Sequence, residues 1–142
     1  MTQVLPDLDI LVREALTAAL PDASVWTLWP DDWAARLPLV VARRVSGGAP
    51  DPRFLDAALV DVQVCAADRT AASLLARRAR AALWDACVAQ FSSTAAGGYL
   101  SRFVDEVGGP AELRTGDDAV LHADVFRFQA TYSLQARPTR AA

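Results

Sequence analysis

The stretch from Leu59 to Gln90 constrains the fold more than any other part of this 142-residue chain. It reads LVDVQVCAADRTAASLLARRARAALWDACVAQ. Its first part alternates, with valine at every second position from Val60 to Val64, which is typical of a half-buried strand. Asp68 is placed as a helix N-cap, and the residues that follow are rich in Ala, Leu and Arg without Gly or Pro. The stretch therefore predicts a strand that turns directly into one long helix.

The predicted long helix carries two apolar stripes. The first is rich in alanine and would lie on the sheet; it consists of Ala72, Leu75, Ala76, Ala79, Ala82, Leu83 and Ala86. The second, which we call the outer stripe, lies on the far side of the helix and consists of Leu74, Ala81, Trp84 and Val88, beside Arg77 and Arg80. A helix on the surface of a monomer is polar at such positions, so the outer stripe needs a partner.

Two partners for the outer stripe remain open. Another helix of the same chain could cover it, and the N-terminal helix is the natural candidate. A neighbouring subunit could cover it instead, with Trp84 as the anchor, because buried Trp and Arg are favoured at the centres of interfaces.

Shorter patterns predict the remaining elements. Asp7 is placed to cap a helix over residues 8–20. Strands are expected at 24–28, 38–45, 59–66, 99–107 and 124–136, and Gly and Pro predict loops at 46–52 and 108–121. The order predicts a single domain over residues 1–142 of the α+β class: a mostly antiparallel sheet with an N-terminal helix and one long central helix packed on one face.

Composition excludes several classes of partner and compartment. The net charge of −3 gives no general reason to bind nucleic acid. Cys65 and Cys87 lack metal-type spacing and are interpreted as small buried thiols in a reducing compartment. The N-terminal MTQVLPDLD lacks the basic and apolar segments of a signal peptide, and no apolar run approaches the ~20 residues of a membrane span. We therefore expect a protein that is cytosolic where it is made and has no membrane partner.

A search for chemistry finds no catalytic, cofactor or metal site. The single histidine, His122, has no nucleophile in a recognisable setting. The glycine pairs do not form a nucleotide-binding loop, and the acidic pairs Asp31-Asp32, Asp105-Glu106 and Asp117-Asp118 have no third placed ligand. Trp26, Trp29 and Trp33 lie close together in the sequence and indicate either core packing or a partner surface. We expect that the protein is not an enzyme.

Three segments together resemble a known family. They are FLDAALVDVQVCAADRTAASLLARRARAAL, GGYLSRFVDEVGGP with its leading loop, and FRFQATYSLQARP; the early PLVVARRVSGG fits the same pattern. In these segments the chain resembles the tail terminator, or tail completion, proteins of long-tailed bacteriophages of actinobacterial hosts, over nearly its whole length.

The resemblance implies a structural virion protein without catalysis. Copies of a small α+β domain would form a hexameric ring on the last layer of tail tube protein, at the head-proximal end of the tail. The ring would stop tube polymerisation, provide the docking surface for the neck or head completion protein, and let DNA pass through its lumen without sequence-specific binding. In such a ring the outer stripe, together with the neighbouring Arg77 and Arg80, would form a subunit interface. The acidic residues Asp105, Glu106, Glu112, Asp117 and Asp118 would suit a loop on the lumen wall.

Two other functions stay open on the sequence alone. Another neck component, such as a head completion or head–tail joining protein, is also a small ring-forming domain. A small-molecule-binding module could use Trp26, Trp29, Trp33 and Phe126 to line a pocket.

Overall fold

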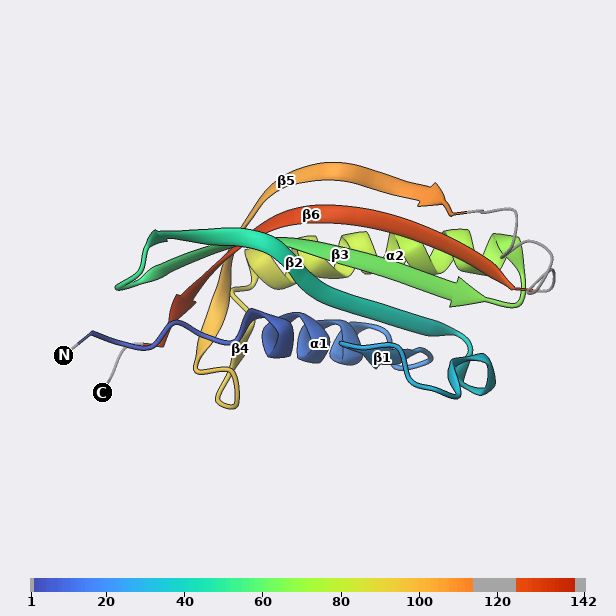
Figure 1. Ribbon diagram of the computed structural model, residues 1–142, viewed down its shortest axis with the longest axis horizontal. Coiled ribbons are helices and arrows are strands. Elements are labelled where there is room, and N and C mark those ends of the chain that lie inside the picture. The colour runs from blue at the N-terminus through green and yellow to red at the C-terminus, as the bar shows by residue number, and fades with distance from the viewer. Residues whose placement is uncertain (1, 114–124, 140–142) are drawn as a thin grey trace.

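The structure is a computed structural model that describes residues 2–113 and 125–139. Its elements are shown in Figure 1, and in chain order they are α1 (Leu8–Ala19), β1 (Ser24–Trp26), the 3₁₀ turn η1 (Trp33–Arg36), β2 (Leu39–Asp51), β3 (Leu55–Ala66), α2 (Arg69–Val88), β4 (Ser92–Ser93), β5 (Gly98–Glu112) and β6 (Phe126–Pro138).

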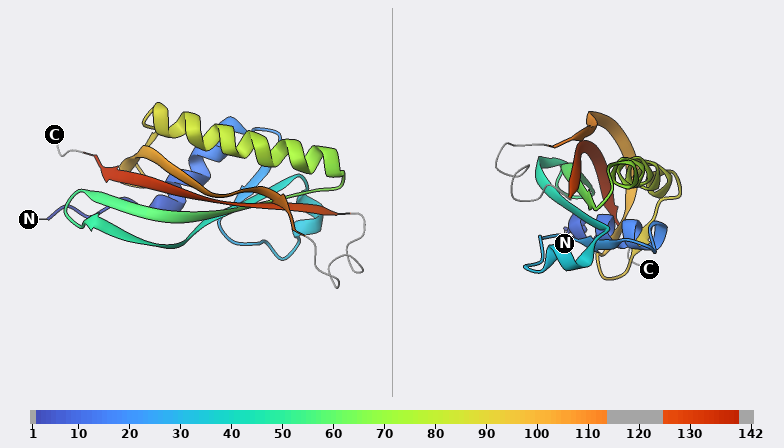
Figure 2. Two further views of the ribbon diagram at one scale, coloured as in Figure 1. Left: turned by 90° about the horizontal axis from the view of Figure 1, so that it is seen from above. Right: turned by 90° about the vertical axis from the view of Figure 1, so that its right-hand side faces the viewer.

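The strands form one sheet in the order β1-β2-β3-β6-β5-β4. Only β1 and β2 pair in parallel, and every other neighbouring pair is antiparallel. The sheet is strongly curled, and α2 lies along its concave side (Figure 2). The predicted α+β class with a mostly antiparallel sheet is confirmed.

Both predicted helix starts are confirmed by capping hydrogen bonds. The Asp7 carboxylate accepts from the backbone N–H of Ile10 at 3.2 Å. The Asp68 carboxylate accepts from the backbone N–H groups of Thr70 at 2.7 Å and Ala71 at 3.3 Å. These bonds satisfy N–H groups that have no partner inside a helix, and they fix where each helix leaves the preceding segment.

The main core lies between the sheet and the two helices. The first apolar stripe predicted for α2, from Ala72 to Ala86, is buried over its whole length, and we call it the inner stripe. It packs with Val60, Val62 and Val64 of β3 and with alternate residues of β6 such as Tyr132 and Leu134. The buried residues of α1, from Leu8 to Leu16, belong to the same cluster. Both helices therefore cover one face of the sheet, as predicted.

A second, smaller core lies on the opposite face, which the sequence predicted to be wet. Leu39, Val41 and Cys65 are buried there, and Trp26, Trp33, Leu37 and Val125 pack against them. The Arg127 guanidinium lies 5.6 Å from the ring centroid of Trp29 and 5.5 Å from that of Trp33. The segment from β1 to β2 folds back over this end of the sheet, so Trp26 and Trp33 are core residues.

Strands extend into two predicted loops. Residues 46–52 belong mostly to β2, which runs to Asp51, so that loop prediction is wrong. β5 runs to Glu112, so the first part of the loop predicted at 108–121 is strand, while residues 114–121 lie outside the described residues. Gly47, Gly48 and Gly108 each have a partner on the neighbouring strand, and the register shifts lie on either side of them. Gly47 has φ +114°, and a Cβ there would lie 2.4 Å from the carbonyl oxygen of Ala57. Glycine at this position allows the hairpin rather than breaking it.

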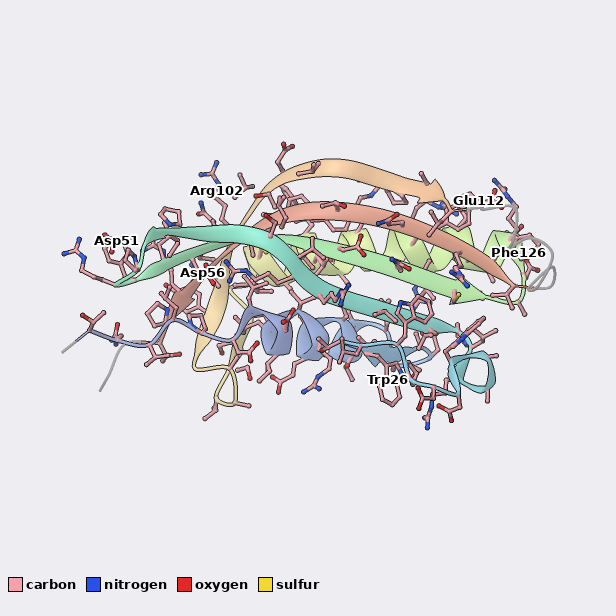
Figure 3. All side chains as sticks on the ribbon, viewed as in Figure 1. Trp26, Asp51, Asp56, Arg102, Glu112 and Phe126 are labelled. Atoms are coloured by element: carbon pink, nitrogen blue, oxygen red, sulfur yellow. The ribbon has the colours of Figure 1, made fainter. Side chains whose placement is uncertain are left out.

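A buried ion pair holds the base of the β2–β3 hairpin. The Arg44 guanidinium contacts both carboxylate oxygens of Asp56, with Nη1–Oδ2 at 2.6 Å and Nη2–Oδ1 at 3.0 Å. Asp56 is only 4% exposed, and Figure 3 places it inward of the hairpin tip marked by Asp51. The backbone N–H of Arg44 donates to Asp9 of α1 at 2.7 Å. The pair therefore lies where the hairpin leaves the body of the domain.

Candidate subunit interface

The outer stripe of α2 is uncovered in this chain. Leu74, Trp84 and Val88 are 47%, 53% and 70% exposed. Of the two alternatives left open for this stripe, coverage by the N-terminal helix is excluded, because α1 lies along another side of α2. The Arg78–Asp22 ion pair, at 3.0 Å, joins α2 to the residues just after α1. Its hydrogen bonds lower the pKa of Asp22 below the ordinary value.

Trp84 is the outer member of a row of three aromatic rings. Its ring centroid lies 5.4 Å from that of Phe103 on β5, which in turn lies 5.4 Å from that of Tyr132 on β6. Tyr132 is fully buried, and its hydroxyl has no hydrogen-bond partner among the described residues. Burial, with a smaller contribution from Glu106, raises the pKa of Tyr132 to about 12. The exposed indole of Trp84 is therefore connected to the buried ring of Tyr132 through its contact with Phe103.

Two hollows flank Trp84 between α2 and β5. One has a volume of about 440 Å³ and is lined by Arg77, Arg80, Ala81, Trp84, Asp85, Phe103 and Glu106. The other, of about 350 Å³, is lined by Trp84, Cys87, Val88, Ser101, Arg102 and Phe103. All the predicted interface residues except Leu74 therefore line one or both of the hollows beside the exposed ring of Trp84. Such a surface suits an interlocking contact with another protein.

The acidic residues predicted for a lumen loop are divided by the structure. Asp105, Glu106 and Glu112 lie in strand β5 and not in a loop, whereas Asp117, Asp118 and also His122 lie outside the described residues. Arg80 pairs with Glu106 at 3.1 Å, and Arg69 pairs with Glu112 at 2.9 Å. Figure 3 shows Glu112 at the end of β5, far from Arg102 near its other end. Two of the acidic side chains are therefore paired across the same α2–β5 contact that carries the candidate interface.

The sequence missed two apolar residues beside the outer stripe. Val104 and Val107 of β5 are 40% and 57% exposed. Each lies at a register shift between β5 and β6, where a bulge removes a residue from the regular alternation. A bulge depends on pairing with a distant strand, so no local pattern marks it.

Neither cysteine is placed for chemistry. Cys65 and Cys87 are both buried and free, as predicted, and burial raises the pKa of Cys87 to about 12. Residues 2–113 and 125–139 contain no group of three potential metal ligands. In the same part of the chain, no helix combines the length and apolarity that a membrane span requires.

Comparison with known proteins places the chain in a family. No curated protein matches the sequence. Among solved structures, a chain described as "Virion of native gene transfer agent (GTA) particle" is similar, with 18% identity, coverage of 92% of this chain and 94% of that chain, and a TM-score of 0.47. Residues 4–142 match the family described as phage tail termination protein, a family of structural tail proteins rather than enzymes. Because this match spans nearly the whole sequence, the chain belongs to the phage tail termination protein family.

Proposed function

We propose that this protein caps the head-proximal end of the phage tail tube as a hexameric ring, stops tube polymerisation and provides the docking surface for the neck. The family match over residues 4–142 carries the proposal. In the assembled particle, the tail tube protein would bind one side of the ring and a neck or head completion protein the other. DNA would pass through the lumen without sequence-specific contacts.

The uncovered α2–β5 surface supports the ring. A cyclic ring needs two different, complementary faces on each subunit. The outer stripe and its two hollows supply one such face, since they combine exposed apolar side chains with a buried aromatic support. Its central residue, Trp84, has the character of an interface anchor.

An acidic lumen wall remains part of the proposal. Glu106 and Glu112 are already paired with arginines, so the repulsion of DNA would come chiefly from the exposed Asp105 and from Asp117 and Asp118. Asp117 and Asp118 are adjacent in the sequence and are tested together. Replacing both by Asn is expected to slow DNA passage or ejection while leaving tail length normal. Ejection triggered in vitro and followed by a DNA-binding dye measures this. Unchanged ejection kinetics would remove the lumen assignment and leave the capping function in place.

Deletion of the gene from its phage tests the capping function. Electron microscopy of the lysate is expected to show tails of uncontrolled length beside filled heads without tails. Complementation with the intact chain should restore normal particles. Tails of normal length that fail to join heads would assign the protein to the neck instead, and intact infectious particles would contradict both roles.

A further inference from the structure

The sheet has two edges that no described strand covers. β5 pairs with β6 along one side, but on its other side β4 reaches only Gly98 and Tyr99. At the opposite end of the sheet, β1 pairs with β2 only as far as Val41. In residues 2–113 and 125–139, the rest of each edge has no strand partner. The backbone N–H of Arg44 is already bound by the Asp9 carboxylate of α1 at 2.7 Å, and that of Leu100 by the carbonyl oxygen of Phe91 at 2.9 Å. Beyond these two residues, uncovered edges expose backbone N–H and C=O groups that another chain can bind.

The open edges of β2 and β5 overlap in their position along the strand direction, and the two strands run antiparallel to each other. Across the sheet, Arg44 is level with Val60, then Tyr132, then Glu106. In the same way Gly48 is level with Ala57, Gln135 and Arg102. Residues 44–48 of β2 and residues 102–106 of β5 therefore lie at the same position along the strand direction. We call these two segments the β2 window and the β5 window.

We propose that the β2 edge of one copy pairs with the β5 edge of the next copy, residues 44–48 against 102–106, so that the sheet continues around the ring. This inference rests on the proposed ring and names its second face. A cyclic ring relates neighbours by rotation without translation along the axis. With the strands roughly along that axis, rotation brings the two level windows side by side, in the antiparallel orientation that the rest of the sheet favours.

The side chains at the bulges favour this pairing over a protected edge. Proteins usually protect open edges with charged residues or prolines at bulges. Here the residues skipped by the register shifts include Val45 on β2 and Val104 and Val107 on β5, and these are 51%, 40% and 57% exposed. Each edge thus carries exposed β-branched side chains at its bulges, although the β5 window also contains the exposed charged residues Arg102, Asp105 and Glu106. Pro50 and Pro110, which lack an N–H group, lie outside the two windows and limit the pairing to them.

Charge and continuity add to the argument. Arg43 beside the β2 window and Asp105 within the β5 window are exposed and form no ion pair in the described part of the chain. Opposite charges on facing edges contribute to register and to the choice of partner. The β5 window also borders the hollows beside Trp84, so one neighbour would cover both the edge and the outer stripe.

A double-cysteine variant tests the contact. Ser46→Cys and Val104→Cys in one chain place a thiol at the middle of each window, where facing Cβ atoms in paired strands lie about 4.5–5.5 Å apart, within disulfide range. The native thiols are buried with raised pKa values, so they should react slowly at pH 8. Oxidation is performed on the purified ring or, if the free chain is monomeric, on purified tails. Each single variant and the pair Val4→Cys with Val104→Cys are controls, since Val4 is 88% exposed but lies near the N-terminus.

The expected result on a non-reducing gel is a ladder of species larger than a dimer, with most of the chain cross-linked and the controls monomeric. Native mass spectrometry of the same samples reports whether rings are present. Rings without cross-links, or cross-linking that stops at dimers, would overturn the edge pairing and leave the capping function standing. Absence of rings both in solution and on tails would overturn the edge pairing together with the proposed ring.

Discussion

Replacement of Asp56 by alanine is expected to destabilise the domain by about 3 kcal/mol, which corresponds to a loss of roughly 10 °C in Tm. The change removes both carboxylate acceptors of the Arg44 guanidinium, whose side chain is only 31% exposed, and leaves that charge with the carbonyl oxygen of Ala57, 3.4 Å from Nη2, and no carboxylate partner among the described residues. Breaking a buried pair from one side costs more than the pair itself contributes, because the remaining charge has lost its water. Thermal unfolding followed by circular dichroism measures the effect.

Asp51→Ala is the matched control for this prediction. Asp51 also pairs with an arginine of the same hairpin, Arg53, at 2.8 Å, but the Arg53 side chain is 71% exposed. An ion pair open to water is worth about 0–1 kcal/mol, so this variant should unfold close to the parent chain. Equal losses in the two variants would show that burial of Asp56 does not determine the stability of the hairpin base.

Replacement of Trp84 by glutamate is expected to abolish ring assembly while the subunit stays folded. Interface anchors contribute about 2 kcal/mol or more per contact, which is roughly a thirtyfold loss in affinity, and a buried carboxylate adds a desolvation cost. In the isolated chain Trp84 is 53% exposed and loses mainly its contact with Phe103. That contact is worth about 0.5–1.5 kcal/mol.

Native mass spectrometry of the purified variant and electron microscopy of phage that carry it measure the loss of assembly. The expected tails resemble those of the gene deletion. Leu28→Glu is the control, because Leu28 is 66% exposed and follows β1, which lies at the end of the sheet order opposite β5. Normal tail length with Trp84→Glu would exclude the outer stripe as a subunit interface.

Local chemistry explains which elements could be predicted from the sequence. Asp7 and Asp68 form caps with neighbours two or three residues away, and the inner stripe of α2 follows the helical period. The alternation of β6, with Phe128, Ala130 and Tyr132 all buried, was likewise readable because one face of that strand lies on the core. These features depend on residues close together in the chain.

The errors all involve partners far away in the chain. Gly47 and Gly48 were interpreted as a loop, yet they pair with Ala58 and Ala57 of β3 between two register shifts. The second core exists because the segment containing Trp26 and Trp33 folds back over Cys65, a contact that no local periodicity encodes. In the candidate site, the outer stripe lies exposed on α2 as the helical period predicts, and its role as a subunit interface stays a prediction. The pairing of Arg80 with Glu106 joined two surfaces that the sequence kept apart.

The bulges of β5 have a consequence for the number of copies in the assembly. Four register shifts interrupt its pairing with β6, and each bulge bends its strand and increases local twist. In a sheet continued from copy to copy, every subunit turns the chain of strands through one fixed angle. In the proposed ring, closure would require those angles to complete a circle, so the curvature inside each subunit would set the number of copies together with the geometry of the contact between them.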